Sequence, residues 1–355
     1  MRNLDNITAE NLLRIESPEL LFSFSQTEAK REYRMLAQRW HPDKHHSPQS
    51  EQVFAHIAIL YKWALEKFKS GDWCEPAEKI ECQKKGWQRF RLNDGSLITC
   101  KYRSHKSFEL GEIWVCDNAI VFELPQNNSS FFENGRKRMH LLTFRDEPML
   151  LEMAKYLPTI EGVHKTAASQ ILVICKTPDQ LNLGDALGYF RSAIEPLASI
   201  GWILNGLLNI ACYLEWAGLN HNSISVENVY ISPLRHSVTL LGGWWYATKS
   251  GEPLSYLPET TFKNLPPDIV RTKISDRRID LECIKHIGRK IVGTPDDTPQ
   301  KFLAHVPEPI ADWLTLPATE SARAEYRNFK EVLFDSFGPP KFIDLNLNAN
   351  LLYKE

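Results

Sequence analysis

The sequence predicts an α+β protein, in which an all-α helical hairpin over residues 1–72 precedes a two-lobed region of mixed strands and helices. Three observations predict this class. Apolar residues recur at helical spacing over 27–40 and again over 50–71. Short runs rich in β-branched and aromatic residues follow within 96–124, separated by turn residues. A long apolar helix over 199–219 then leads into a loop and two short strands.

The composition argues against several classes of function. The net charge of -2 gives no global attraction to nucleic acid or to an anionic membrane, so neither is expected as a partner. No apolar run has the length and uniformity of a membrane span, and the first residues lack the apolar core of a signal peptide. The seven cysteines form no Cys-x-x-Cys pair, which argues against a zinc module and a disulfide framework. We therefore expect a cytoplasmic protein without a metal or cofactor.

The first seventy residues contain three predicted helices. A short one starts after Ser17, a residue type suited to N-capping, with Pro18 at the first helical position. Thr27 is expected to cap the second helix, and Gly71 is expected to follow the third. The apolar stripe of the second helix consists of Ala29, Tyr33, Leu36, Ala37 and Trp40, and that of the third of Val53, Phe54, Ile57, Leu60, Tyr61, Ala64 and Phe68. Two such amphipathic helices joined by a short loop form an antiparallel hairpin.

The loop of this hairpin contains His41-Pro42-Asp43, followed by Lys44. Basic residues of the second helix fall largely off its apolar stripe and form a basic exposed face: Lys30, Arg31, Arg34 and Arg39. Such a face steers and docks an acidic partner surface. Two other interpretations stay open, an incidental loop beside a solvated helix face, and a metal site of His41, His45 and His46. The metal site is the weaker one, because no rigid set of carboxylates or thiolates accompanies the histidines.

Residues 16–70 resemble the J-domain of DnaJ-type co-chaperones, with a short first helix, a basic second helix, the loop tripeptide and a long third helix. The resemblance implies that the loop and the basic face bind a DnaK-type 70-kDa chaperone and stimulate its ATP hydrolysis. The implied contact residues are His41, Pro42, Asp43, Lys44, Lys30, Arg31, Arg34 and Arg39. The chain has no Gly/Phe-rich linker and no repeated Cys-x-x-Cys region, so the remainder is expected to supply the targeting.

The rest of the chain divides by its pattern into a linker, two lobes and a tail. The predicted ranges are 73–90 for the polar linker, 91–178 for the small lobe, 179–340 for the large lobe and 341–355 for the tail. Strands are expected over 96–102, 112–117, 119–124 and 169–178, a break at 126–135, and helices over 145–157, 199–219, 308–316 and 322–337. Three leucines of the tail, Leu345, Leu347 and Leu351, are candidates to pack back on the rest of the chain, at a place that the sequence does not define.

The order of these elements resembles a protein kinase over roughly residues 100–340. In "GLNHNSISVENVYI", His221 and Asn228 match the catalytic loop, whereas Ser223 stands where kinases carry the catalytic aspartate. In "LLGGWW", Gly243 stands at the position of the metal-binding aspartate. Asp280 matches the anchoring aspartate of the buried helix that follows.

Further positions are matched less closely. Asp268 in "NLPPDIV" takes the acidic position of the Ala-Pro-Glu segment. No Lys or Arg occurs from residue 108 to 134, where the third strand of the kinase pattern is expected, so the strand lysine has no match there. If that strand is instead 139–144, Thr143 stands at the position of the lysine. Gly111 stands alone, without a glycine-rich loop, and Glu152 is a candidate helix glutamate without a lysine to pair with.

Phosphoryl transfer needs charge neutralisation at the phosphates, metal ligands and an oriented hydroxyl. Ser223 cannot accept a proton as a carboxylate does, and Gly243 cannot hold Mg²⁺. The resemblance therefore implies a pseudokinase without catalytic residues, in which His221, Asn228 and Asp280 have structural roles. We expect the aromatic side chains of residues 244–246 to fill the metal and phosphate region.

The leading hypothesis is a co-chaperone that recruits a DnaK-type chaperone and is targeted to a specific client protein or assembly by an inactive kinase-like domain. The alternative is a divergent protein kinase or a nucleotide-binding switch regulated by the J-domain. A third hypothesis is a structural assembly protein whose hairpin has lost its coupling to a chaperone. The intact tripeptide and the basic residues favour the first.

Overall fold

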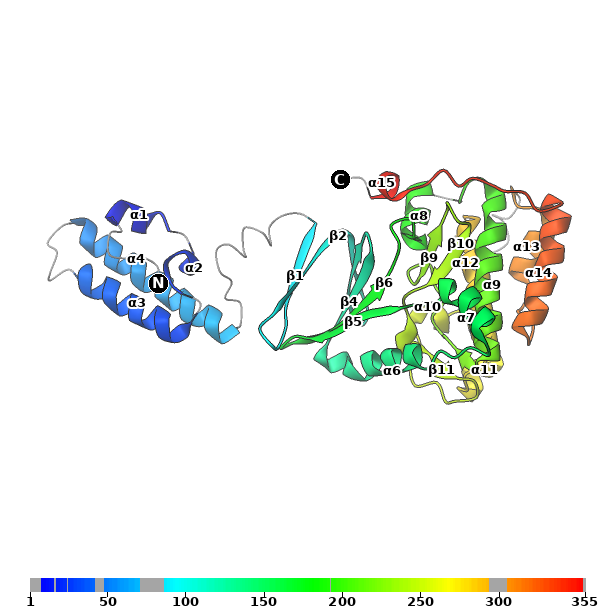
Figure 1. Ribbon diagram of the computed structural model, residues 1–355, viewed down its shortest axis with the longest axis horizontal. Coiled ribbons are helices and arrows are strands. Elements are labelled where there is room, and N and C mark those ends of the chain that lie inside the picture. The colour runs from blue at the N-terminus through cyan, green and yellow to red at the C-terminus, as the bar shows by residue number, and fades with distance from the viewer. Residues whose placement is uncertain are drawn as a thin grey trace. The chain divides into compact units, whose positions relative to one another are not determined.

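The computed structural model describes residues 8–15, 17–23, 25–41, 48–70, 86–191, 193–293 and 305–353. The chain divides into two compact units, residues 1–89 and residues 90–355, whose elements are labelled in Figure 1. Gly71 and most of the predicted linker lie outside the described residues, as do Pro42, Asp43, Lys44, His45 and His46.

The first unit is helical. It contains α1 (Ala9–Leu13), α2 (Pro18–Leu21), α3 (Gln26–Arg39) and α4 (Pro48–Ser70). The Tyr33 ring stacks on Tyr61 with centroids 4.1 Å apart, and the His41 ring meets Phe54 edge-on at 5.4 Å. Tyr33 thus contacts the later residue Tyr61, whereas His41, further along the chain, contacts the earlier residue Phe54. Helices α3 and α4 are therefore antiparallel. The predicted apolar stripes meet in one core of Leu12, Leu21, Phe22, Ala29, Leu36, Val53, Ile57, Leu60 and Ala64.

Two details of this unit differ from the prediction. Helix α1 was not expected; Thr8 caps it by accepting a hydrogen bond from Asn11 N at 3.4 Å. Thr27 is wrong as the cap of the second helix. The N-cap of α3 is Ser25, whose carbonyl accepts the first helical hydrogen bond from Ala29 N at 2.8 Å, so Thr27 lies inside the helix.

The second unit begins with a curled antiparallel sheet. Its strands are β1 (Trp87–Arg91), β2 (Leu97–Phe108), β3 (Gly111–Cys116), β4 (Ala119–Pro125), β5 (Ile160–Lys165) and β6 (Ser169–Cys175), in the order β1-β2-β3-β4-β6-β5. One face packs into the main core, and the opposite face buries a second cluster of Phe90, Trp114, Cys116, Val121 and Ile171. The four predicted strands are present. Strands β1 and β5 were not predicted, and β1 starts inside the range given to the linker.

The segment after β4 corrects the prediction more substantially. Residues expected to break the pattern form η1 (Gln126–Asn128) and α6 (Ser129–His140). Phe132, Gly135 and Met139 recur at helical spacing and are buried, so a core-facing stripe stabilises α6 although Asn134-Gly135 is a turn-like dipeptide. The alternative third strand at 139–144 is therefore wrong, since α6 continues to His140. Asp146 caps the following helix α7 (Glu147–Met153), which continues into η2 (Ala154–Tyr156).

The helical part of this unit carries the remaining elements. They are β7 (Leu181–Asn182), α8 (Leu183–Phe190), η3 (Leu197–Ser199), α9 (Ile200–Trp216), β8 (Leu219–Asn220), β9 (Val229–Ser232), β10 (Ser237–Leu240), η4 (Trp244–Tyr246), β11 (Thr248–Lys249), α10 (Glu259–Phe262), α11 (Pro267–Thr272), α12 (Arg278–Ile291), α13 (Glu308–Thr315), α14 (Ala322–Phe337) and α15 (Ala349–Leu352). Strands β10, β9 and β7 form one small sheet, and β11 pairs with β8. The predicted helices at 199–219, 308–316 and 322–337 are confirmed.

Helix α9 lies at the centre of this part and contacts α12, α14 and β10 (Figure 1). Among the described residues, Leu197–Trp216 is the one segment apolar and long enough to cross a membrane, with a mean hydropathy of 1.5. Ile203, Leu207 and Leu208 of this helix are fully buried in the main core. The apolar character of α9 is accounted for by this packing.

Candidate functional site

The predicted basic face lies on the outer side of α3. Lys30, Arg31, Arg34 and Arg39 are all exposed. His41, one residue after the C-cap Trp40, is half-buried against Phe54. The structure therefore places His41 at the end of α3 that leads into the loop, while the other three loop positions of the prediction lie outside the described residues.

Two acidic residues near this face are turned inward, whereas Glu28 of α3 is exposed. The carboxylate of Glu32 on α3 accepts two hydrogen bonds from Ser23, one from the backbone N–H at 2.7 Å and one from the side-chain hydroxyl at 2.5 Å. Glu19 is 1% exposed and pairs with Lys67 of α4 at 2.5 Å. Because these carboxylates are occupied within the core of the hairpin, the outward charge of α3 is mainly positive.

In the second unit, the segment predicted to match a catalytic loop is buried. His221 Nε2 lies 3.0 Å from the carbonyl oxygen of Gly242, and the carboxylate of Asp280 accepts hydrogen bonds from His221 N and Asn222 N, each at 2.7 Å. Burial lowers the pKa of His221 to about 3 and raises the pKa of Asp280 to about 7. His221 is thus a neutral side chain in the core near neutral pH.

Positions 223 and 243, which the prediction matched to two catalytic positions, come together in space around Asn228. Asn228 Nδ2 donates to the Ser223 carbonyl at 2.8 Å and to its hydroxyl at 3.0 Å. Gly243 has a positive φ of 79°, and a Cβ there would come within 2.6 Å of Asn228 Nδ2 and 2.7 Å of His221 Cε1. A larger side chain at position 243 therefore does not fit this arrangement.

The three aromatic residues that follow Gly243 are buried. Trp244, Trp245 and Tyr246 are 1%, 3% and 4% exposed. Trp244 meets the His221 ring edge-on at 4.8 Å. Trp245 contacts Phe122 of β4 and stacks on Phe132 of α6. These contacts join the sheet, α6 and the helical part by apolar packing.

The turn between β2 and β3 is drawn into the same region. Leu110 is 5% exposed within the main core, and its carbonyl accepts a hydrogen bond from Asn128 Nδ2 at 2.9 Å. The Glu109 carboxylate accepts a hydrogen bond from the Tyr246 hydroxyl at 2.6 Å. A Cβ at Gly111 would lie 1.9 Å from the carbonyl oxygen of Glu123, so this glycine permits the close approach of β3 to β4.

Glu152 does not join these residues. It lies exposed on α7 and pairs with Lys155 at 2.9 Å. Sequence reasoning missed a different lysine, Lys106 of β2, which lies just before the segment that lacks basic residues. Its ammonium is 2.5 Å from Asp185 Oδ1 and 2.9 Å from Asn182 Oδ1, so it links the sheet to the start of α8. The sequence held one signal for the acidic partner of Lys106: the spacing Asn182-x-x-Asp185 is typical of a helix N-terminus and places both side chains at the start of α8.

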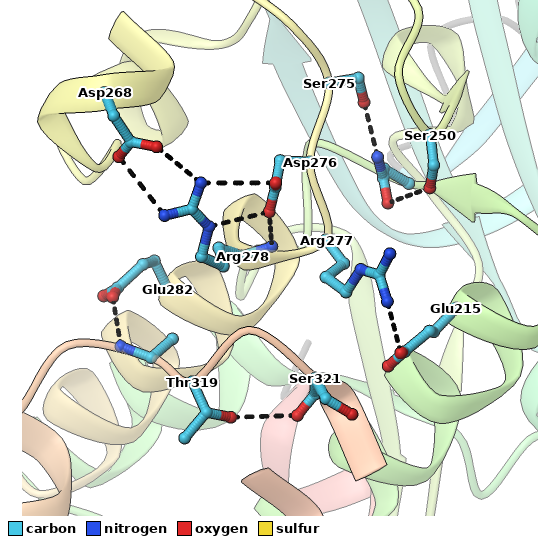
Figure 2. Close-up of polar contacts among 12 residues, drawn as sticks. Glu215, Ser250, Asp268, Ser275, Asp276, Arg277, Arg278, Glu282, Thr319 and Ser321 are labelled. Atoms are coloured by element: carbon cyan, nitrogen blue, oxygen red, sulfur yellow. Dashed lines mark hydrogen bonds and ion pairs between the residues drawn. The ribbon is translucent and has the colours of Figure 1, made fainter. Parts of the chain in front are cut away.

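Asp268, predicted at the acidic position of the Ala-Pro-Glu segment, binds an arginine. Arg278 Nη2 is 2.6 Å from Asp268 Oδ2, and Arg278 Nε is 3.0 Å from Asp276 Oδ1. Figure 2 shows the guanidinium between the two carboxylates, with the Arg277–Glu215 ion pair close by. The two hydrogen bonds that Arg278 donates to Asp268 hold α11 to the start of α12. Within the described ranges, no three His, Cys, Asp or Glu side chains gather as a metal site.

Comparisons with known proteins give structural likeness only. No family model and no curated protein matches this sequence. One similar solved structure is the BubR1 kinase domain, at 11% identity, covering 69% of this chain and 82% of that one with a TM-score of 0.46. Another is vaccinia related kinase 3, at 15% identity, covering 73% and 93% with a TM-score of 0.49. At these TM-scores the likeness carries no functional argument.

Proposed function

We propose that this chain is a cytoplasmic J-domain co-chaperone that recruits a DnaK-type 70-kDa chaperone and stimulates its ATP hydrolysis. The observation that supports the proposal is the antiparallel pairing of α3 with α4. In the sequence, His41, Pro42 and Asp43 lie between these two helices. The exposed basic residues of α3 supply a docking face for an acidic chaperone surface, because charge complementarity accelerates association and sets orientation.

The second unit would then act as a binding domain that brings the chaperone to one client protein or assembly. We assign it a kinase-like fold without phosphoryl transfer. Ser223 and Gly243 replace the acidic groups that such chemistry needs, and the buried Trp244 packs edge-on against His221 beside them.

ATP turnover by a DnaK-type chaperone tests the first half of the proposal. We expect the full chain to accelerate steady-state hydrolysis severalfold, and Asp43→Asn to abolish the acceleration. Asp335→Asn, on the exposed surface of α14, is the matched control and should stimulate as the wild type does. Stimulation that survives Asp43→Asn would exclude this loop as the trigger.

The basic face is tested by a charge reversal in the same assay. We expect Arg34→Glu to raise the concentration needed for half-maximal stimulation by about tenfold at low salt, since rim charges act mainly on association. Lys62→Glu makes the same charge change on the exposed face of α4 and should have little effect. Equal effects of the two variants would mean that net charge, and not the α3 face, determines binding.

The inactive-enzyme assignment has its own test. We expect neither transfer of the γ-phosphate from Mg-ATP to general protein substrates nor a thermal shift of the full chain by Mg-ATP. Saturable binding of Mg-ATP at micromolar concentration would instead support the nucleotide-switch alternative. This result would leave the chaperone assay unaffected, so the two halves of the proposal can fail separately.

A further inference from the structure

The C-terminal segment of the chain runs back over the helical part after α14. In Figure 1 it passes from α14 to α15, which lies beside α8. Residues 339–348 form neither helix nor strand. Leu345 and Leu347 are 0% and 6% exposed, while the residues between and beside them face outward. The segment is thus an extended strip with one apolar edge packed on the main core.

Aromatic contacts anchor the beginning of this strip. The Phe342 ring stacks on His236 with centroids 4.0 Å apart and planes 9° apart, and His236 stacks in turn on Trp202 at 5.1 Å. Phe342 is nevertheless 74% exposed, because only one face of its ring is covered. This anchor is a surface contact and not a core residue.

The end of the strip is anchored by α15. Asn348 caps it, accepting a hydrogen bond from Leu351 N at 3.0 Å. Leu351, Leu352 and Tyr353 are partly buried against the main core. The Tyr353 hydroxyl accepts a hydrogen bond from Asn182 N at 3.4 Å, and burial beside Asp185 raises its pKa. The last described residue of the chain therefore touches the first turn of α8.

Asn182 connects this end of the tail to the sheet. Its side-chain oxygen accepts hydrogen bonds from Lys106 Nζ at 2.9 Å and from Asp185 N at 3.2 Å. Its side-chain nitrogen donates to the Glu227 carbonyl at 2.8 Å. Lys106 is the β2 residue that also pairs with Asp185. One residue thus contacts the tail, the sheet and the loop before β9.

We propose that residues 342–353 form a strap that holds β2 against α8 through Asn182, and that releasing the strap loosens this junction. Without Tyr353, the Asn182 backbone loses its cover, and the Lys106–Asp185 pair, already 30% and 18% exposed, becomes more accessible to water. Water competes for their hydrogen bonds and screens the ion pair. The proposal depends only on the second unit, so it stands or fails independently of the chaperone function.

Hydrogen exchange measured by mass spectrometry on the full chain tests the strap. We expect Tyr353→Ala to accelerate amide exchange about fivefold in peptides from β2 and from the start of α8, because local opening there requires less free energy. Exchange in α11, α12 and the first unit, which neither anchor contacts, should stay at the wild-type rate. Phe342→Ala, which releases the other anchor, should give the same pattern with a smaller amplitude.

Two further variants separate the contribution of the Tyr353 hydroxyl from that of the Tyr353 ring. Tyr353→Phe keeps the ring and removes the hydroxyl, so any acceleration that it causes reports the contact with Asn182. Tyr326→Phe removes a hydroxyl on α14 and should leave the β2 peptides unchanged. Wild-type exchange of β2 and α8 in Tyr353→Ala would overturn the proposal. So would a uniform acceleration over the whole second unit, since that reports a general loss of stability and not a local strap.

Discussion

The indole of Trp245 lies directly against the backbone of Gly135 on α6, so closely that a Cβ at Gly135 would come within 2.5 Å of its Cε3 atom. Asn134 reinforces this contact by donating to the carbonyl oxygens of Trp245 at 2.9 Å and Ala247 at 3.0 Å. Figure 1 shows α6 beneath the sheet. Trp245 connects α6 to the sheet, because its ring meets the ring of Phe122 on β4 edge-on at 5.3 Å. A glycine in mid-helix is therefore needed for a tertiary contact.

The first prediction concerns this glycine. Gly135→Ala should destabilise the second unit by about 1–3 kcal/mol, since the added methyl overpacks the indole and outweighs the gain in helix propensity. Gly188→Ala on α8 is the control, because its Cβ would meet nothing within 4 Å. That variant should be neutral or stabilising by up to about 1 kcal/mol. Urea unfolding followed by tryptophan fluorescence measures both; a neutral Gly135→Ala would contradict the close packing.

The second prediction concerns pH. His221 has a pKa of about 3 in the folded chain, below that of an unfolded histidine, so the unfolded state binds more protons between about pH 6.5 and 3. The stability that its neutral form contributes is present above pH 6.5 and is lost as the pH falls through this window, by up to about 1.4 kcal/mol for each pH unit.

His221→Gln should therefore reduce the slope of unfolding free energy against pH in this window, even if it lowers stability at pH 7. The exposed His140, at the end of α6, provides the matched variant His140→Gln, whose profile should follow that of the wild type. Parallel profiles for the wild type and His221→Gln would show that His221 is not the group that titrates.

The third prediction concerns the buried ion pair between α12 and α14. Lys285 and Glu325 are 3.1 Å apart with side chains 2% and 1% exposed, and the ammonium also donates to the Trp313 carbonyl at 2.8 Å. Glu325→Ala should cost about 3–5 kcal/mol, because it leaves a buried charge uncompensated. Combining Lys285→Met with Glu325→Leu should recover most of that loss.

Thermal or urea unfolding of these variants provides the measurement. Glu152→Ala breaks the exposed pair with Lys155, and should cost less than about 1 kcal/mol. If the double replacement is no more stable than Glu325→Ala, packing and not the unpaired charge causes the loss.

The fourth prediction concerns Arg278 and Asp268. A double-mutant cycle with alanine at both positions should give a coupling of about 0.5–1.5 kcal/mol, because the pair is well aligned but the carboxylate is half exposed. The exposed helical pair Glu259–Lys263 should give only about 0.3–0.5 kcal/mol. Equal couplings would mean that Asp276 alone positions the guanidinium.

Local pattern was sufficient for much of the fold. The stripes that contain Leu36 and Ile57 predicted the helical hairpin, because burial of one helix face imposes its period on neighbouring residues. Helix α14 was predicted with its observed bounds, since Ser321 caps it and Gly338 follows it. Helix α6 was missed, because its asparagine and glycine are turn formers that only the contact with Trp245 explains.

The candidate sites divide in the same way. The tripeptide, the basic residues of α3 and the non-acidic residues Ser223 and Gly243 can be read from residue type and order alone, and the roles assigned to them stay predictions. The third-strand alternative at Thr143 depended on which segments are helices, and there sequence reasoning failed, because α6 continues to His140.

The sequence by itself determined the helical hairpin, the main strands and the presence of Ser223 and Gly243 at two positions of interest, since these depend on period and residue identity. Only the tertiary structure decided that Leu110, Trp245 and Tyr246 share one buried region, and that Tyr353 reaches Asn182, 171 positions earlier. The reason is physical: period is set by near neighbours along the chain, whereas these contacts depend on how distant segments close around a common core.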